Sequence, residues 1–324
     1  MSADGRPLGR AAVDVAELVR QAREGQARAV GRLVSLVEDE SPVLREAMAR
    51  LAPYAGAAHV VGITGAPGVG KSTTTSALVA VLRHRGQRVA VLAIDPSSPF
   101  SGGALLGDRI RMSEHATDPG VFIRSMAARG HLGGLAWTTP QALRVLDATG
   151  FDVVLVETVG VGQSEVDVAD AADTTVVLLA PGMGDGIQAA KAGILEIGDV
   201  YVVNKADREG AATVRRDLRS MLSHTERTSD AWRPPALLAS ARTGQGLDEV
   251  VQELDAHLAW ARGSGALEQR RLRRARAEVE AIALTALRRR WAGTSDRDRL
   301  DDLAGRVLSG EIDLYAAADE LLEP

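Results

Sequence analysis

Residues Gly65 to Ser72 read GAPGVGKS and match the phosphate-binding pattern GxxxxGK[ST] at every fixed position. The preceding HVVGIT is predicted to be a buried strand, and the following TTTSALVAVLRHRG is predicted to be a helix. In that context the N–H groups of the loop point at an anion beside a helix N-terminus. Lys71 is expected to reach the β- and γ-phosphates, and Ser72 to offer its hydroxyl to Mg²⁺. The predicted nucleoside triphosphate site comprises Gly65, Ala66, Pro67, Gly68, Val69, Gly70, Lys71, Ser72 and Thr73.

The composition restricts the class of protein. Among 324 residues, 45% are hydrophobic and 25% charged, which is ordinary for a soluble globular chain. The net charge of −5 gives no general attraction to nucleic acid or anionic membranes, and the absence of cysteine excludes disulfides and thiolate metal sites. No apolar run reaches the roughly 18 residues of a spanning helix, and MSADGRPLGR lacks a signal-peptide core. A cytoplasmic enzyme that binds neither nucleic acid nor membrane is expected.

The hydrophobic pattern changes twice along the chain and predicts three parts. Residues 1–57 are expected to form a helical extension, 58–262 an α/β nucleotide-binding domain, and 263–324 a helical arm after the Gly263-Ser264-Gly265 hinge. Most apolar runs of the central part are continuous, as expected of parallel strands covered by helices on both faces. The seven predicted strands are 59–64, 88–95, 121–126, 152–158, 174–180, 200–206 and 235–240.

Five arginines lie between Arg270 and Arg276 in the first helix of the C-terminal part. Nucleic-acid binding is one interpretation of such a cluster, and a solvated face of a packing helix is the other. No aromatic residue is interleaved with the arginines, so the solvated face is favoured.

The motif NKAD, which ends the predicted strand 200–206, indicates the base of the nucleotide. The carboxylate of Asp207 is expected to accept from N1–H and the 2-amino group of guanine, a donor pair that adenine lacks. The stem of Lys205 would lie along the base, and Asn204 would tie this loop to the phosphate loop. A main-chain N–H of Ser240-Ala241, after the last strand, would back the base. GTP is therefore predicted over ATP.

Acidic residues at the ends of other strands predict the metal environment. Glu157 stands where most GTPases have the Asp of DxxG, and Gly160 would offer its N–H to the γ-phosphate. Asp95 and Asp108 are further candidates near Mg²⁺, although Asp108 has the alternative of capping a helix. No Gln follows Gly160 directly, and Gln163 lies three residues further on, so slow intrinsic hydrolysis is expected. The predicted catalytic residues are Lys71, Asp108, Glu157 and Gln163.

Several longer stretches are similar to one family. With GITGAPGVGKST, AIDPSS, LGDRIRM, ETVGVGQSEVDVAD, APGMGDGIQAAKAGILEIGD and VVNKAD, the chain closely resembles the MeaB/ArgK/MMAA family of metallochaperone-type GTPases. The resemblance runs from about residue 10 to the C-terminus. It implies a P-loop G domain of the SIMIBI class with an N-terminal helical extension and a C-terminal dimerisation arm, and hence a homodimer.

The resemblance also implies a role. Such proteins bind adenosylcobalamin-dependent acyl-CoA mutases, usually methylmalonyl-CoA mutase, and use GTP hydrolysis to GDP to gate cofactor loading and removal of damaged cofactor. The cobalamin is carried by the mutase, not by this chain. By position, Gly162, Gln163 and Glu165 would belong to one switch and Asp185, Gln188 and Lys191 to a second that faces the mutase. Gly186 departs from the acidic residue that many relatives have there, so a salt bridge of that switch is expected to be missing and its loop more flexible.

Alternatives from other classes stay open. A nickel-insertion GTPase needs Cys or His ligands, and this chain has no cysteine and no closely spaced histidine pair. A binding module that holds GTP without significant turnover would show no hydrolysis even with a mutase present. A kinase would prefer ATP, which the NKAD motif argues against.

Overall fold

A computed structural model of the chain describes residues 14–96, 112–128, 138–158, 164–182, 195–223, 230–291 and 294–322. The chain divides into two compact units, Met1–Arg271 and Leu272–Pro324. The boundary falls inside helix α12 (Ala266–Trp291). Within the described parts, no helix is long and apolar enough to cross a membrane.

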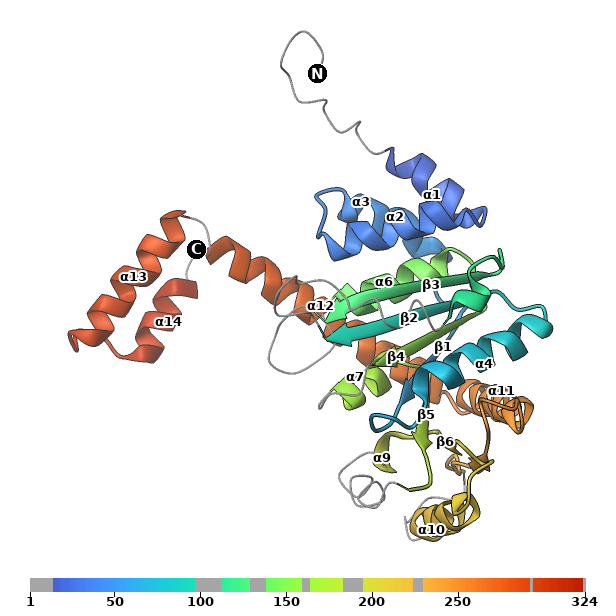
Figure 1. The fold of residues 1–324 in the computed structure, drawn as a ribbon. Helices are drawn as coiled ribbons and strands as arrows, with labels where there is room; N and C mark the ends of the chain where they lie inside the picture. Colours follow the sequence, from blue (N-terminus) through green and yellow to red (C-terminus); the bar gives the residue numbers. More distant parts are fainter. Residues whose placement is uncertain are drawn as a thin grey trace. The chain divides into compact units, whose positions relative to one another are not determined.

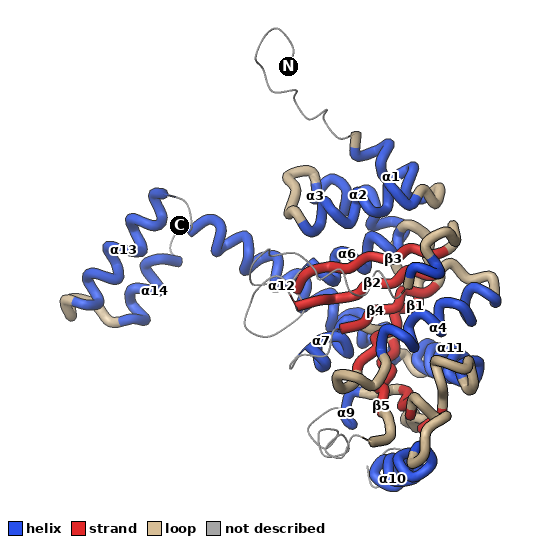
Figure 2. The backbone as a smooth tube through the Cα atoms, in the orientation of Figure 1, coloured by secondary structure: helices blue, strands red, loops and turns tan. Residues whose placement is uncertain are grey.

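A seven-stranded parallel sheet forms the centre of the first unit, in the order β3-β2-β4-β1-β5-β6-β7 (Figure 2). The sequence predicted all seven strands and their parallel arrangement. Six of them are close to the expected bounds, whereas β6 ends three residues early because Asn204 and Lys205 leave the sheet for the site. The strands are β1 (His59–Thr64), β2 (Val89–Pro96), β3 (Val121–Ala128), β4 (Val153–Thr158), β5 (Thr174–Leu179), β6 (Val200–Val203) and β7 (Ala236–Leu238).

Helices cover both faces of this sheet (Figure 1). The apolar faces of the N-terminal helices pack in one core with α6, α7 and alternate residues of β1 to β4, so the first helices share a core with the sheet. On the opposite face, α4 and α11 pack on the remaining side chains of the same strands and on β5 and β6. A smaller core joins α10 to β5, β6 and β7.

The remaining elements of the first unit are helical. They comprise α1 (Val15–Arg23), α2 (Ala27–Glu38), α3 (Leu44–Leu51), η1 (Ala52–Tyr54), α4 (Lys71–His84), η2 (Ser113–His115), α6 (Thr138–Ala148), α7 (Ser164–Ala171), α9 (Leu195–Ile197), α10 (Ala211–Ser223) and α11 (Leu247–Gly263). The second unit contains the rest of α12, α13 (Thr294–Leu308) and α14 (Leu314–Leu322). These helices lie within residues 263–324, for which the sequence predicted a helical structure.

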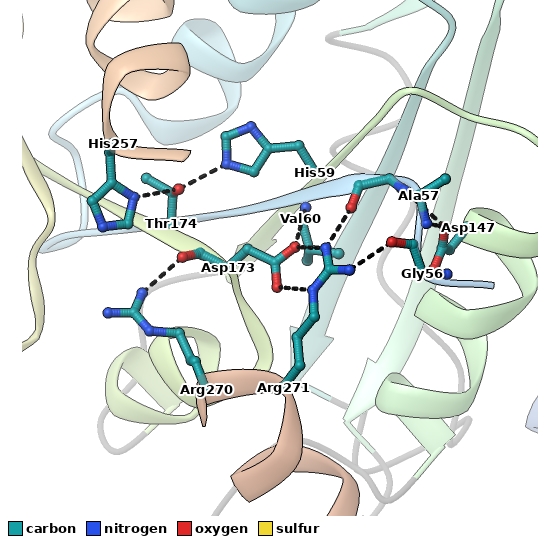
Figure 3. A network of polar contacts seen from close by, with 11 residues as sticks. Gly56, Ala57, His59, Val60, Asp147, Asp173, Thr174, His257, Arg270 and Arg271 are labelled. Carbon is teal, nitrogen blue, oxygen red and sulfur yellow. Dashed lines mark hydrogen bonds and ion pairs between the residues drawn. The ribbon is translucent and has the colours of Figure 1, made fainter. Parts of the chain in front are cut away.

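The start of α12 is attached to the amino end of the sheet by two arginines (Figure 3). Arg271 donates from Nε and Nη2 to both carboxylate oxygens of the fully buried Asp173, at 3.1 and 2.6 Å. It also donates to the carbonyls of Gly56 and Ala58. Arg270 donates to both oxygens of Asp199, at 2.7 and 3.1 Å. The prediction of a solvated arginine face is therefore wrong for these two residues, because each pairs with a carboxylate before β5 or β6.

Two buried histidines share one hydroxyl beside these ion pairs (Figure 3). His59 Nε2 and His257 Nδ1 each lie 2.7 Å from Thr174 Oγ1. Burial lowers the pKa of His59 to about 4. Burial acts to raise the pKa of Asp199, but hydrogen bonds from His257 and Arg270 lower it to about 2. The amino ends of β1, β5 and β6 thus meet in one polar network.

Candidate nucleotide-binding site

The phosphate loop joins β1 to α4, as expected, and two glycines fix its path. Gly65 has φ +139°, and a Cβ there would lie 2.4 Å from the carbonyl oxygen of Leu178 on β5. Gly70 has φ +99°, and a Cβ there would lie 2.6 Å from Asn204 Nδ2. Any other residue would have to adopt a disfavoured backbone conformation and displace a neighbouring strand or loop. The two glycines therefore allow the loop to lie against β5 and β6.

Lys71, the first residue of α4, has its ammonium group inside this loop. Its Nζ donates to the carbonyl of Gly65 at 2.6 Å and to that of Ala66 at 3.3 Å. Its side chain is largely buried beside a helix N-terminus, which attracts anions. A phosphate oxygen placed in the loop would replace neutral carbonyls as the acceptor and form a stronger, charge-assisted bond.

The other loop residues divide into an exposed tip and a buried base. Pro67 and Gly68 are exposed, whereas Val69 is buried in the core beneath α4. Thr73 is exposed on the first turn of α4. Lys205, with φ +58°, reaches across and donates from Nζ to the carbonyl of Gly68 at 2.6 Å.

Asn204 connects three segments from the carboxyl ends of different strands. Its Nδ2 donates to the carbonyl of Val69 at 2.8 Å, which is the predicted tie to the phosphate loop. Its Oδ1 accepts from the N–H of Ala241 at 3.2 Å. Because the side chain is buried, these bonds are shielded from water. One amide therefore holds the phosphate loop, the NKAD loop and the Ser240-Ala241 loop together.

Asp207 is presented by the same loops. Ser240 Oγ donates to Asp207 Oδ1 at 2.7 Å, and this bond lowers the pKa of the carboxyl group. Arg242, whose side chain is 79% exposed, donates from Nη2 to Asp207 Oδ2 at 3.0 Å. The carboxylate is ionised at neutral pH and able to accept from a base with two adjacent donors.

Glu157 ends β4, beside β1 in the sheet, and its side chain is buried with 1% exposure. Its Oε2 accepts from Thr75 Oγ1 on α4 at 2.6 Å. Ser72 and Thr75 are three residues apart on that helix and so share a face. A carboxylate and a hydroxyl on one face are oxygen ligands of the kind Mg²⁺ prefers. These residues fit a Mg²⁺ ion bound together with the nucleotide phosphates, and the ion would neutralise charge on the γ-phosphate.

Several predicted residues cannot be placed in this geometry. Asp95 is the penultimate residue of β2, and Glu165 lies in the first turn of α7. The described residues contain no group of three or more His, Asp or Glu side chains that could hold a metal ion. Residues outside the described ranges are Asp108, Gly160, Gly162, Gln163, Asp185, Gln188 and Lys191.

Residues 112–115 lie against α4. Met112 is buried in the core under this helix. Ser76 Oγ donates to Glu114 Oε1 and lies 3.0 Å from His115 Nε2. Helix α4, which begins at the phosphate loop, therefore also contacts residues 112–115.

The sequence analysis missed Thr75 and Arg242. Thr75 lies in a Thr73-Thr74-Thr75 run in which only spacing from Ser72 distinguishes the members. Arg242 directly follows the Ser240-Ala241 pair that was considered for base binding. Neither residue belongs to a known motif. Each could have been found only from its spacing to a residue of a recognised motif.

Comparison with known proteins identifies the family. The family model described as "Methylmalonyl Co-A mutase-associated GTPase MeaB" matches residues 30–296. A putative GTPase of Pyrococcus abyssi is 45% identical over 95% of each chain. The mitochondrial methylmalonic aciduria type A homolog of Mus musculus is 38% identical over 81% of this chain and 64% of its own.

A solved structure has a similar fold over most of its length. The crystal structure of a LAO/AO transport system kinase superposes with a TM-score of 0.69 at 28% identity, covering 95% of this chain and 96% of the other. The similarity includes the parallel sheet and the helices at both ends of the chain. With these matches and the nucleotide loops described above, this chain belongs to the MeaB family of methylmalonyl-CoA mutase-associated GTPases.

Proposed function

We propose that this GTPase binds GTP with Mg²⁺ and uses its hydrolysis, in the cytoplasm, to gate the loading, protection or reactivation of adenosylcobalamin on an acyl-CoA mutase. Methylmalonyl-CoA mutase is the proposed client. The cobalamin is bound by the mutase, and the nucleotide bound to this chain, GTP or GDP, would control when the cofactor is loaded or removed. The observation that supports nucleotide binding is the pair of hydrogen bonds made by the Asn204 side chain. They join the NKAD loop, which contains Asp207, to the phosphate loop and to the Ser240-Ala241 loop.

The proposed roles follow from the contacts of each residue. Lys71 would exchange the carbonyls of Gly65 and Ala66 for phosphate oxygens, while Ser72 and Glu157 would hold Mg²⁺ directly or through water. Asp207 would accept from guanine. Asp95, Asp108, Gly160, Gln163 and the two switch segments keep the roles predicted from the family resemblance.

The client is supported by the family description and by the name of the mouse relative. The test is GTP hydrolysis by the purified chain alone and with purified methylmalonyl-CoA mutase, under single-turnover and steady-state conditions. A rate increase and co-elution with the mutase are expected. If hydrolysis occurs but neither responds to this mutase, the client assignment fails and the GTPase assignment stands. Other acyl-CoA mutases then become the next clients to test.

We also propose a homodimer formed through the second unit. Within that unit, large apolar side chains are exposed to an extent that isolated monomers rarely tolerate on so small a fold. They are Leu272, Val279, Ile282, Leu284, Leu287, Leu300, Leu308, Leu314, Tyr315 and Leu322. Sedimentation equilibrium of the full chain is expected to give twice the chain mass. The double variant Val279→Glu with Ile282→Glu is expected to shift it toward the monomer, while Arg276→Glu leaves the mass unchanged.

A further inference from the structure

Thr75 contacts the carboxylate at the end of β4 from the second turn of the phosphate-loop helix. The threonine is fully buried, and its Oγ1 lies 2.6 Å from Glu157 Oε2. The same oxygen lies 3.1 Å from the carbonyl of Lys71 in the preceding turn. Thr75 thus links the residue before Ser72 to the acidic residue of β4.

The two contacts compete for one proton. A hydroxyl donates one hydrogen bond, and its contact with the carboxylate is shorter than its contact with the helix carbonyl. The proton is therefore directed to Glu157, while the carbonyl of Lys71 is the alternative acceptor when the carboxylate moves. Glu157 is buried, so it would lose a hydrogen bond that water cannot readily replace if the hydroxyl were removed.

The neighbouring threonine lacks this contact and defines what is special about Thr75. Thr74 is also buried, and its Oγ1 donates to the carbonyl of Gly70 at 2.9 Å, four residues back on the same helix. Both hydroxyls therefore bond to the helix backbone. Of the two threonines, Thr75 is the one that bonds to the Glu157 carboxylate and the one that shares a face with Ser72.

We propose that Thr75 is a positioning residue that fixes the Glu157 carboxylate on the α4 face carrying Ser72, and so sets the affinity of the site for Mg²⁺. This inference rests on the proposed function of Glu157 and Ser72. The threonine does not touch the nucleotide in this scheme. It acts through Glu157, by holding one carboxylate oxygen in place before the ion binds.

The test is the Mg²⁺ dependence of binding of a fluorescent GTP analogue to the full chain, measured at equilibrium. Thr75→Val keeps the shape of the side chain and removes the hydroxyl, whereas Thr75→Ser keeps the hydroxyl. Thr74→Val is the matched control. The Mg²⁺ concentration for half-maximal enhancement of binding is expected to rise about tenfold in Thr75→Val, the effect of one hydrogen bond to a charged group. It should stay within about twofold of the wild type in Thr75→Ser and Thr74→Val.

Nucleotide affinity in EDTA and thermal unfolding without nucleotide separate this effect from damage to the fold. Nucleotide affinity in EDTA is expected to be the same for the two valine variants, and thermal unfolding is expected to show both of them folded at the temperature of the titration. An unchanged Mg²⁺ titration in Thr75→Val, or an equal shift in Thr74→Val, would overturn the inference about Thr75. The proposed function would still stand in that case if the wild type binds GTP with the help of Mg²⁺. A wild type that binds the analogue equally with and without Mg²⁺ would overturn the inference together with the metal part of that function.

Discussion

Lys71 and Lys205, at the carboxyl end of the sheet, donate to backbone carbonyls of the phosphate loop, whereas Arg270 and Arg271, at the amino end, donate to buried aspartates. The difference lies in what happens when a ligand arrives. A lysine exchanges its hydrogen bond to a neutral carbonyl for one to a phosphate, because the charged acceptor forms the stronger bond. A buried carboxylate cannot give up its arginine without leaving an uncompensated charge.

The two ends therefore use similar side chains for different purposes. Contacts at the carboxyl end are arranged to be exchanged, and loss of one should change ligand binding more than folding. Contacts at the amino end join β1, β5 and β6 to the start of α12, and Figure 3 shows those to β1 and β5. Loss of one should change folding more than ligand binding. The predictions below separate these two outcomes.

The largest effect is expected from Arg271→Met at the amino end. The substitution removes two hydrogen bonds from the fully buried carboxylate of Asp173, which also accepts one from the N–H of Val60. Removing one partner of a buried pair costs about 4 kcal/mol. Urea unfolding of the full chain, followed by circular dichroism, is the measurement. GTP affinity at low urea should stay within about twofold of the wild type.

Two further variants define this result. Arg273→Met, an exposed member of the same arginine run, should change the free energy of unfolding by at most about 0.5 kcal/mol. Adding Asp173→Asn to Arg271→Met should restore part of the loss, because the buried site is then neutral. If Arg271→Met weakens GTP binding as much as it destabilises the fold, the two ends of the sheet are not separate in function.

At the carboxyl end, Asp207→Asn is expected to change base preference. The carboxamide can donate to the 2-oxo group of xanthine but no longer accepts two bonds from guanine. The ratio of GTP to xanthosine triphosphate affinities should fall about 100-fold, since one bond to guanine is lost and the other is no longer made to a charged acceptor. Competition binding measures the ratio, and thermal unfolding without nucleotide should be nearly unchanged. Undiminished preference for GTP would remove Asp207 from base recognition.

Short motifs made the nucleotide end predictable from the sequence. GAPGVGKS and NKAD each lie within one loop, so the place of Lys71 at the phosphate loop and the tie from Asn204 followed from local spacing. The strands were equally predictable from the sequence, because buried parallel strands are continuous apolar runs. The end of β6 was misplaced because the apolar pattern continues into a motif whose backbone turns away at Lys205.

The amino end and Thr75 were not predictable for the opposite reason. Arg271 meets a carboxylate 98 residues away in the sequence, and Thr75 meets one 82 residues away. Such pairs depend on which strands become neighbours and on which face of a helix is turned inward. A run of five arginines looks alike whether or not two of its members are buried, so only the fold distinguishes Arg270 and Arg271 from Arg273.

The network at the amino end also predicts how stability responds to acid. His59 is buried beside Asp173, His257, Arg262 and Arg271, and its pKa falls to about 4 from 6.5 in the unfolded chain. Below pH 6.5 the unfolded chain takes up a proton at His59 that the folded chain excludes. The free energy of unfolding is therefore unaffected by His59 above pH 6.5 and falls as the pH is lowered toward 4. The loss between pH 7.5 and 5 is about 2 kcal/mol.

The measurement is the free energy of unfolding in urea as a function of pH. His59→Gln should flatten the slope between pH 6.5 and 5, whatever its effect at pH 7.5. Asp199, with a pKa of about 2 against 3.8, should add its own loss of stability only below pH 4. An unaltered slope in His59→Gln would assign the acid sensitivity to a different group in the network.

The smallest effect is expected from Arg242→Ala, which tests whether contacts at the carboxyl end are exchangeable. Arg242 occupies Asp207 Oδ2 from a position that is mostly in solvent, so the pair contributes less than about 1 kcal/mol. Guanine must compete with this guanidinium for the carboxylate, and its removal should tighten GTP binding about threefold at low salt. The difference should vanish in 1 M salt, where exposed charges are screened. Weaker binding by Arg242→Ala would mean that the arginine holds the nucleotide instead of occupying its place, and the carboxyl end would then contain a fixed contact like those of the amino end.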